Sequence, residues 1–85
     1  MPLPAIAPDR WLLQVFSARA AVEGGIVRRR IRDVDRLVGE ARFLVEVHRR
    51  GFRVVRNAGQ YVVFCNREPV ELLIPDDRPR DNQIP

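Results

Sequence analysis

Apolar residues in the first third of the chain recur at helical spacing. They predict a helix from about residue 10 to residue 23, with four residues on one face: Trp11, Val15, Ala18 and Val22. Asp9 is a suitable N-cap, and Gly24-Gly25 suits the helix end, because glycine accepts the left-handed conformation of a C-terminal cap. Residues 1–8, which include three prolines, are expected to form a flexible lead-in.

Residues 26–32 are too few for a helical repeat and are predicted to form a strand. Side chains alternate between the two faces of a strand, so one face collects three arginines: Arg28, Arg30 and Arg32. A face this basic cannot be buried. The strand is therefore expected at a sheet edge, or with one face in water.

A second helix is predicted from Asp33 or Asp35 to about Arg50. Its apolar residues cover an arc of roughly 120°, which indicates a helix buried over much of its circumference. Gly39 is the weak point, because glycine costs about 1 kcal/mol relative to alanine inside a helix. The chain either continues through Gly39 or breaks there into two shorter helices.

Residues 52–56 and 60–65 show the alternation of a β-hairpin. Asn57-Ala58-Gly59 suits a three-residue loop with Gly59 at the position of positive φ. In that register one face is apolar and carries Phe52, Val54, Val62 and Phe64. The other face carries Arg53, Val55, Tyr61, Val63 and Cys65.

The remaining chain adds one short strand and a tail. Val70 to Ile74 is predicted as a further strand, and residues 75–85 as a disordered polar tail. The whole pattern predicts an α+β fold, in which a small three- to four-stranded, mainly antiparallel sheet packs against two helices in the order α-β-α-β-β-β. With 85 residues, 46% of them hydrophobic, the chain supports one small core, and we expect a single domain over residues 9–74.

The basic residues are all arginine and are unevenly placed. Ten of the fifteen lie between residues 28 and 56, where four acidic residues leave a net charge of +6. Such clustering favours an anionic partner, nucleic acid above all. A GC-rich genome also encodes arginine in place of lysine, and charge runs are often only solvated surfaces, so composition alone does not decide the function.

The leading hypothesis is a non-enzymatic module that binds RNA or DNA through phosphate contacts. Arginines two apart on a strand lie about 6.5–7 Å apart, which is comparable to the spacing of phosphates along a nucleic-acid strand, and a tyrosine on an outward face would stack on a base. The candidate residues are Arg28, Arg30, Arg32, Arg53, Arg56 and Tyr61. The alternative is a protein-interaction or homodimerisation module that uses a strand edge or the sheet face of Val55, Tyr61 and Val63.

Few side chains are available for catalysis or metal binding. Ser17, His48 and Cys65 are each the only residue of their type, which excludes an intramolecular disulfide and a zinc site of four His and Cys ligands. His48 is expected to be a core or boundary residue and Cys65 a buried, inert thiol, and Ser17 lacks a nucleophile elbow. We expect no catalytic residue, no metal and no cofactor.

The chain shows no membrane or export signal. No apolar run approaches the roughly 18–20 residues of a membrane span. The first eight residues lack the basic region of a secretory signal. With a single cysteine, the expected compartment is the cytoplasm.

The stretch from Gly51 to Phe64, preceded by a helix, resembles the start of HicA-type toxins. These are small RNA-cleaving modules with a fold like that of double-stranded-RNA-binding domains. The matching positions are Gly51, Phe52, Arg56, Gly59 and Phe64. The family places Ser-His after the turn glycine, and its His does the chemistry, whereas Gln60-Tyr61 stand there in this chain. The resemblance implies a local helix-hairpin fold and carries over no catalytic residue.

A winged-helix arrangement is the second analogy. If the chain breaks at Gly39, residues 40–50 become a recognition helix and the hairpin at 52–65 becomes a wing. That helix is short, and its apolar arc leaves few side chains to reach base edges. We therefore rank this arrangement below the first hypothesis.

Overall fold

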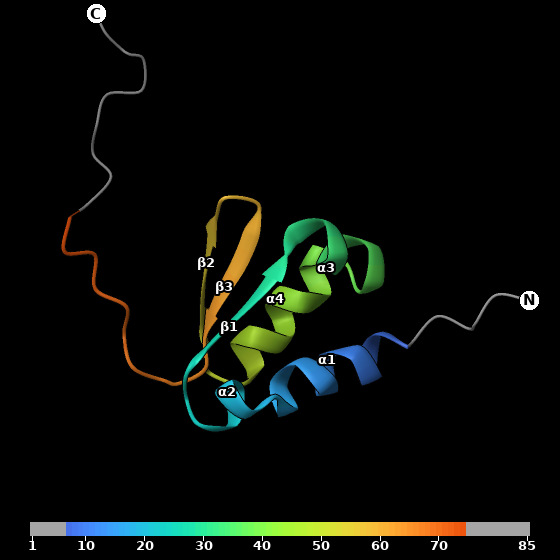
Figure 1. The fold of residues 1–85 in the computed structure, drawn as a ribbon, viewed down its shortest axis with the longest axis horizontal. Helices are drawn as coiled ribbons and strands as arrows, with labels where there is room; N and C mark the ends of the chain where they lie inside the picture. The colour runs from blue at the N-terminus through green and yellow to red at the C-terminus, as the bar shows by residue number, and fades with distance from the viewer. Residues whose placement is uncertain (1–6, 75–85) are drawn as a thin grey trace, which may run out of the picture.

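The computed structural model describes residues 7–74 of the chain. Within this range a pair of helices precedes a strand, and a second pair of helices precedes a hairpin (Figure 1). The elements are α1 (Pro8–Ser17), α2 (Arg19–Val22), β1 (Ile26–Arg30), α3 (Ile31–Leu37), α4 (Glu40–Arg49), β2 (Arg53–Asn57) and β3 (Gln60–Phe64). The tail expected at residues 75–85, and most of the expected lead-in, lie outside the described residues.

The three strands form one antiparallel sheet in the order β1-β3-β2. β3 lies in the middle and pairs with β1 on one side and with β2 on the other. The longer helices α1, α3 and α4 all lie on one side of this sheet, so the molecule has a helical layer and a sheet layer (Figure 1). The predicted α+β class and antiparallel sheet are confirmed.

The core lies between the two layers and centres on Phe43 of α4, which is fully buried. The centroid of its ring lies 6.3 Å from that of Phe16 in α1 and 5.1 Å from that of Tyr61 in β3. Val34 and Val63 belong to the same cluster and are also fully buried. One aromatic cluster therefore joins α1 and α4 to the face of the sheet that is turned towards the helices, which we call the inner face.

The hairpin differs from the predicted register by one residue. Its turn contains only Ala58 and Gly59, both with positive φ (51° and 75°), and Asn57 pairs with Gln60. Two-residue turns of this kind match the twist of the flanking strands. A shift of one residue moves each side chain to the opposite face. As a result, the apolar face predicted for the hairpin is wrong, and Tyr61 points towards the helices.

The first helix begins and ends at other residues than predicted. α1 has Pro8 in its first turn, where the missing N–H leaves no hydrogen bond unmade, and Asp9 lies inside that turn instead of capping it. The helix predicted up to residue 23 divides at Ala18, whose backbone is extended (φ −59°, ψ 150°). Nothing in the local sequence explains this break.

The predicted strand 26–32 ends two residues early. The N–H of Ile31 donates a hydrogen bond to the carbonyl of Gly59 in the hairpin turn (2.9 Å), and α3 begins at Ile31. Arg32 therefore lies on a helix, and its predicted place on the strand face beside Arg28 and Arg30 is wrong.

The second predicted helix breaks at Gly39. This residue has φ 94° and ψ 144°, a conformation that is essentially restricted to glycine. The break separates α3 from α4, and α4 packs against β2. Of the two alternatives left open by the sequence, the chain adopts the two shorter helices.

The segment from Val70 to Ile74 is not a strand, and that prediction is wrong. Its side chains are exposed, and it pairs with none of the three strands. Its apolar and β-branched residues favour a strand only where the segment can pair with the edge of a sheet. In this structure the segment runs away from both edges (Figure 1).

Candidate functional site

The outer face of the sheet, away from the helices, is open. Residues that pair across an antiparallel sheet share a face, and the register places three rows of side chains on the outer face. These rows are Ile26-Phe64-Arg53, Arg28-Val62-Val55 and Arg30-Gln60-Asn57. Every member of the rows is exposed or partly exposed. We call this surface the open sheet face.

The arginines of the open sheet face have no carboxylate partner in the described portion of the chain. Within residues 7–74, no ion pair involves Arg28, Arg30 or Arg53. The same holds for Arg32, at the start of α3, and for Arg29, whose guanidinium donates to the neighbouring carbonyl of Arg28 (2.6 Å). The positive charge of this surface is therefore not neutralised by neighbouring acids.

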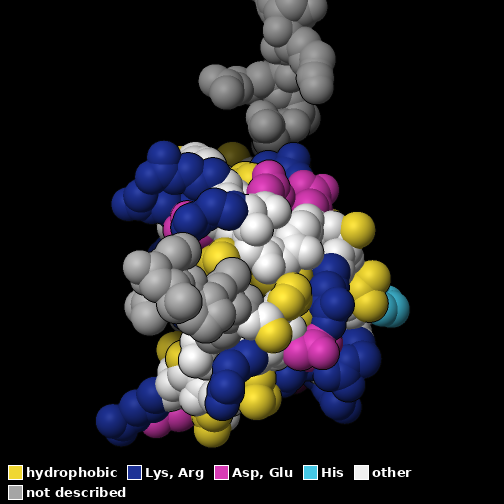
Figure 2. Space-filling view, turned by 90° about the vertical axis from the view of Figure 1, so that its right-hand side faces the viewer, with side chains coloured by type: hydrophobic (Ala, Val, Ile, Leu, Met, Phe, Trp, Pro, Cys, Tyr) yellow, Lys and Arg dark blue, Asp and Glu magenta, His cyan; other side chains and the backbone are white. Residues whose placement is uncertain are grey.

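The other five arginines of residues 28–56 each contact a carboxylate. The pairs are Arg36 with Asp33, Arg42 with Asp9, Arg49 and Arg50 with Glu46, and Arg56 with Glu40. On the helical side of the molecule, basic side chains are accordingly interleaved with acidic and apolar ones (Figure 2). The ten arginines of residues 28–56 thus divide into five that contact a carboxylate and five, on the open sheet face or at adjacent positions of β1 and α3, that do not.

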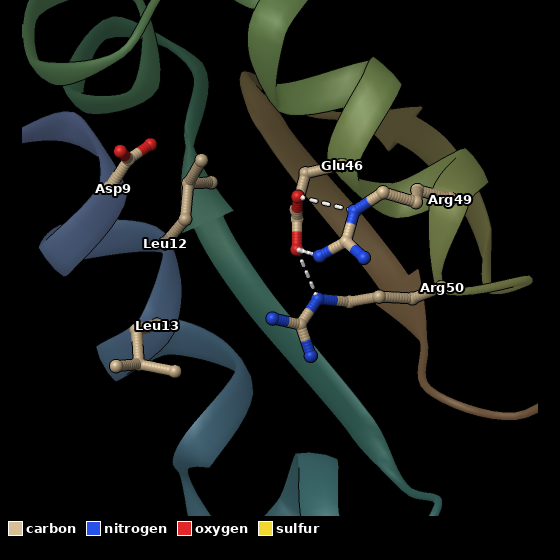
Figure 3. A pocket seen from close by; sticks show the side chains of 6 residues that line it. All are labelled: Asp9, Leu12, Leu13, Glu46, Arg49 and Arg50. Carbon is tan, nitrogen blue, oxygen red and sulfur yellow. Dashed lines mark hydrogen bonds and ion pairs between the residues drawn. The ribbon is translucent and has the colours of Figure 1, made fainter.

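Glu46 shows how the helical half is neutralised. A groove of about 240 Å³ lies between α1 and α4, and at its edge the carboxylate of Glu46 accepts hydrogen bonds from Arg49 (2.8 Å) and Arg50 (2.5 Å) (Figure 3). The hydrogen bonds from Arg49 hold the pKa of Glu46 below its usual value, although burial acts in the opposite direction. Arg50 also lies over the ring of Phe16, 4.7 Å from its centroid. These side chains form a structural ion-pair network.

Tyr61 is not available to stack on a base in this structure. Only 2% of its surface is exposed, because β3 turns it towards Phe43. Its hydroxyl donates a hydrogen bond to Glu40 Oε1 (2.7 Å), the same atom that accepts from Arg56 (3.0 Å). Burial, followed by the hydrogen bond to Glu40, raises the pKa of Tyr61. The expected exposure of Tyr61 is wrong, and so is the continuous face of Val55, Tyr61 and Val63.

Phe64 takes the exposed aromatic position that was predicted for Tyr61. It lies on the open sheet face between Ile26 and Arg53, and it is partly exposed. The sequence does contain the signal for this exchange: Ala58-Gly59 as a two-residue turn assigns Phe64, and not Tyr61, to the face of Arg53. Gln60 and Asn57 add two amide side chains in the next-but-one row.

The candidate nucleophiles and the candidate base, each the single residue of its type, come from three different parts of the fold. Cys65 is buried directly after β3, and burial raises the pKa of its thiol. Ser17 is exposed at the end of α1, and His48 is exposed near the end of α4, so the expected core or boundary position of His48 is wrong. Within residues 7–74 no three acidic, His or Cys side chains gather in a way that would hold a metal ion.

None of the helices described between residues 7 and 74 has the length and hydrophobicity required to cross a membrane. The positions that carry the resemblance to HicA-type toxins lie in or just before the β2–β3 hairpin, with Gln60 and Tyr61 opening β3. No protein-family model, curated protein or solved structure matches this chain.

Proposed function

We propose that this protein is a non-enzymatic module that binds single-stranded nucleic acid on the open sheet face. One observation carries the proposal: within residues 28–56, the five arginines that lack a carboxylate partner in the described chain lie on this face or on adjacent positions of β1 and α3. Unneutralised guanidiniums grip phosphates in charge-assisted, bidentate hydrogen bonds. On the helical side, Arg36, Arg42 and Arg49 already pair with carboxylates.

The arrangement of the face suits a single strand. Arg28 and Arg30 lie two residues apart on β1, or about 6.5–7 Å, which suits successive phosphates. Phe64 offers an apolar ring beside Arg53, and stacking of a base on an aromatic side chain is worth roughly 1–3 kcal/mol. The amides of Gln60 and Asn57 can donate to and accept from base edges. A flat sheet with basic and aromatic side chains reads unpaired bases better than it fits a duplex groove.

Fluorescence anisotropy with labelled, random-sequence RNA and DNA strands tests this function. The variant Arg28→Glu/Arg30→Glu is expected to lose at least about tenfold in affinity. The matched control Arg36→Glu/Arg42→Glu makes the same change in net charge on the helical side and should lose much less. Both variants change exposed side chains, and circular dichroism checks that they fold.

The salt dependence gives an independent measurement. For single strands, log K falls with log salt by about 0.7 per phosphate contact. Removing the charges of Arg28 and Arg30 should therefore make this slope shallower by about 1.4. If the wild-type protein binds no strand at all, or if both double variants lose affinity equally, the open sheet face is not the binding site.

The break at Gly39 favours a second candidate, the binding of duplex DNA through α4. Two helices followed by a hairpin, with strand order β1-β3-β2, reproduce the winged-helix arrangement. The exposed side chains of α4 include Val45 and His48, while Arg42 and Arg49 are engaged by carboxylates. This route predicts preference for a duplex, a loss on His48→Ala and no loss on Arg28→Glu/Arg30→Glu.

A further inference from the structure

The edge of the sheet at β2 carries an apolar groove. β2 is an outer strand, so its outward backbone N–H and C=O groups face no other strand of residues 7–74. Between β2 and α4 lies a groove of about 210 Å³, lined by Leu44, Val54, Val55, Arg56 and Tyr61. Val45, which follows Leu44 along α4, is 65% exposed. An unprotected edge with adjoining apolar surface is a site for an added strand.

The same chain contains an exposed apolar segment after the sheet. From Val70 to Ile74 four of five residues are apolar, and Leu72, Leu73 and Ile74 are 74%, 85% and 91% exposed. Within residues 7–74, no hydrogen bond joins residues 69–74 to any other element. In Figure 1 the segment runs away from the helices and the sheet, coloured orange to red.

We propose that Val70–Ile74 of one copy adds as a strand to the β2 edge of a second copy, so that two chains exchange these segments in a dimer. Each chain has one such segment and one free β2 edge. In a reciprocal exchange, the segment of each chain therefore pairs with the β2 edge of the other chain. The result is a closed two-fold dimer instead of an open filament. The proposal is independent of nucleic-acid binding.

The alternation of the segment matches the two sides of β2. As a strand, the segment places Val70, Leu72 and Ile74 on one side, and Glu71 and Leu73 on the other. The first side fits the groove of Leu44, Val54 and Tyr61. The second side lies with the open sheet face, where Arg53 has no ion pair in the described chain and Val55 is 38% exposed. Glu71 has the charge opposite to that of Arg53, and Leu73, like Val55, is apolar.

Light scattering and sedimentation over a range of protein concentrations test the exchange. The wild-type protein is expected to approach twice the 9.8 kDa of one chain as concentration rises. The variant Leu72→Glu/Ile74→Glu should remain at the mass of one chain, and because both positions are exposed it should still fold. Leu13→Glu, at a 59% exposed position of α1, is the matched control and should dimerise like the wild type.

A charge exchange provides the second test. Arg53→Glu and Glu71→Arg are each expected to weaken dimerisation by roughly tenfold, and the two together should restore it. A wild-type protein that stays at the mass of one chain overturns the proposal, including the case in which the segment folds back onto its own β2. A dimer that persists in Leu72→Glu/Ile74→Glu also overturns it. Either result leaves the test on Arg28 and Arg30 unaffected.

Discussion

The two faces of the sheet are made from adjacent residues and lie in opposite environments. On the inner face, Tyr61 and Val63 are buried against Phe43 and hold the two layers together. On the outer face, Val62 and Phe64 remain partly exposed among arginines that have no acidic partner within residues 7–74. Strand alternation alone separates the residues that stabilise the fold from those available to a ligand. One step of register would exchange them.

The largest expected difference between the faces concerns their two aromatic residues. Tyr61→Ala should lower the free energy of unfolding by about 3–5 kcal/mol, because it removes a buried ring and leaves a cavity beside Phe43. Phe64→Ala should cost only about 1 kcal/mol, since solvent already reaches its ring. Urea denaturation, followed through the single Trp11, measures both values. The reverse ranking would contradict the observed hairpin register.

The same pair of variants separates stability from binding. Under conditions in which it is folded, Phe64→Ala should lose about tenfold or more in affinity for a single strand, because a stacking platform is removed. Val62→Ala, one row further on the same face, is the control and should bind nearly as the wild type does. If Phe64→Ala binds a single strand as tightly as the wild type, Phe64 does not stack on a base, and the site consists of phosphate contacts alone.

Much of the fold could be predicted from the sequence because it depends on strong local patterns. The helical spacing around Phe43 and the glycines at positions 24, 39 and 51 mark segments whose identity survives tertiary packing. The register of the hairpin could not be derived with the same security. It depends on Ala58 adopting a positive φ, which alanine accepts only at a cost. Likewise, the local sequence of Val70–Ile74 favours a strand but does not show that the segment pairs with no strand of the sheet.

The candidate site could be predicted only to a limited extent, for a related reason. Alternation was sufficient to place Arg28 and Arg30 on one exposed strand face. Which arginines are neutralised was not visible, because the pair of Arg56 with Glu40 spans sixteen residues and that of Arg42 with Asp9 joins two helices. Net charge per segment therefore overstated the free charge on α4.

The substitution Gly39→Ala tests the break between α3 and α4, because a continuous helix and the observed backbone predict opposite changes in stability. In a continuous helix, Gly39→Ala would stabilise the protein by about 1 kcal/mol. At the observed φ of 94° and ψ of 144°, the substitution should instead destabilise it by about 1–3 kcal/mol. No atom lies within 4 Å of the added Cβ, so the effect comes from the backbone alone. Denaturant midpoints of the two proteins decide whether α3 and α4 are separate, and hence how α4 covers the inner face.

The smallest expected effect concerns the hydroxyl group of Tyr61 on the inner face. Tyr61→Phe removes the hydrogen bond to Glu40 and should cost about 1 kcal/mol near neutral pH, since Glu40 keeps its ion pair with Arg56 and is reached by water.

Burial raises the pKa of Tyr61 above its usual value of 10.0, so the folded state holds the phenolic proton more tightly than the unfolded state does. The stabilisation is therefore complete below pH 10.0 and declines as the pH rises through the folded pKa. The gap between wild type and Tyr61→Phe should narrow in that range, and because Tyr61 is the only tyrosine, its tyrosinate absorbance reports the titration directly. A gap that stays constant while Tyr61 ionises at its usual pKa would place the hydroxyl in water, and would contradict the division between the two faces at this residue.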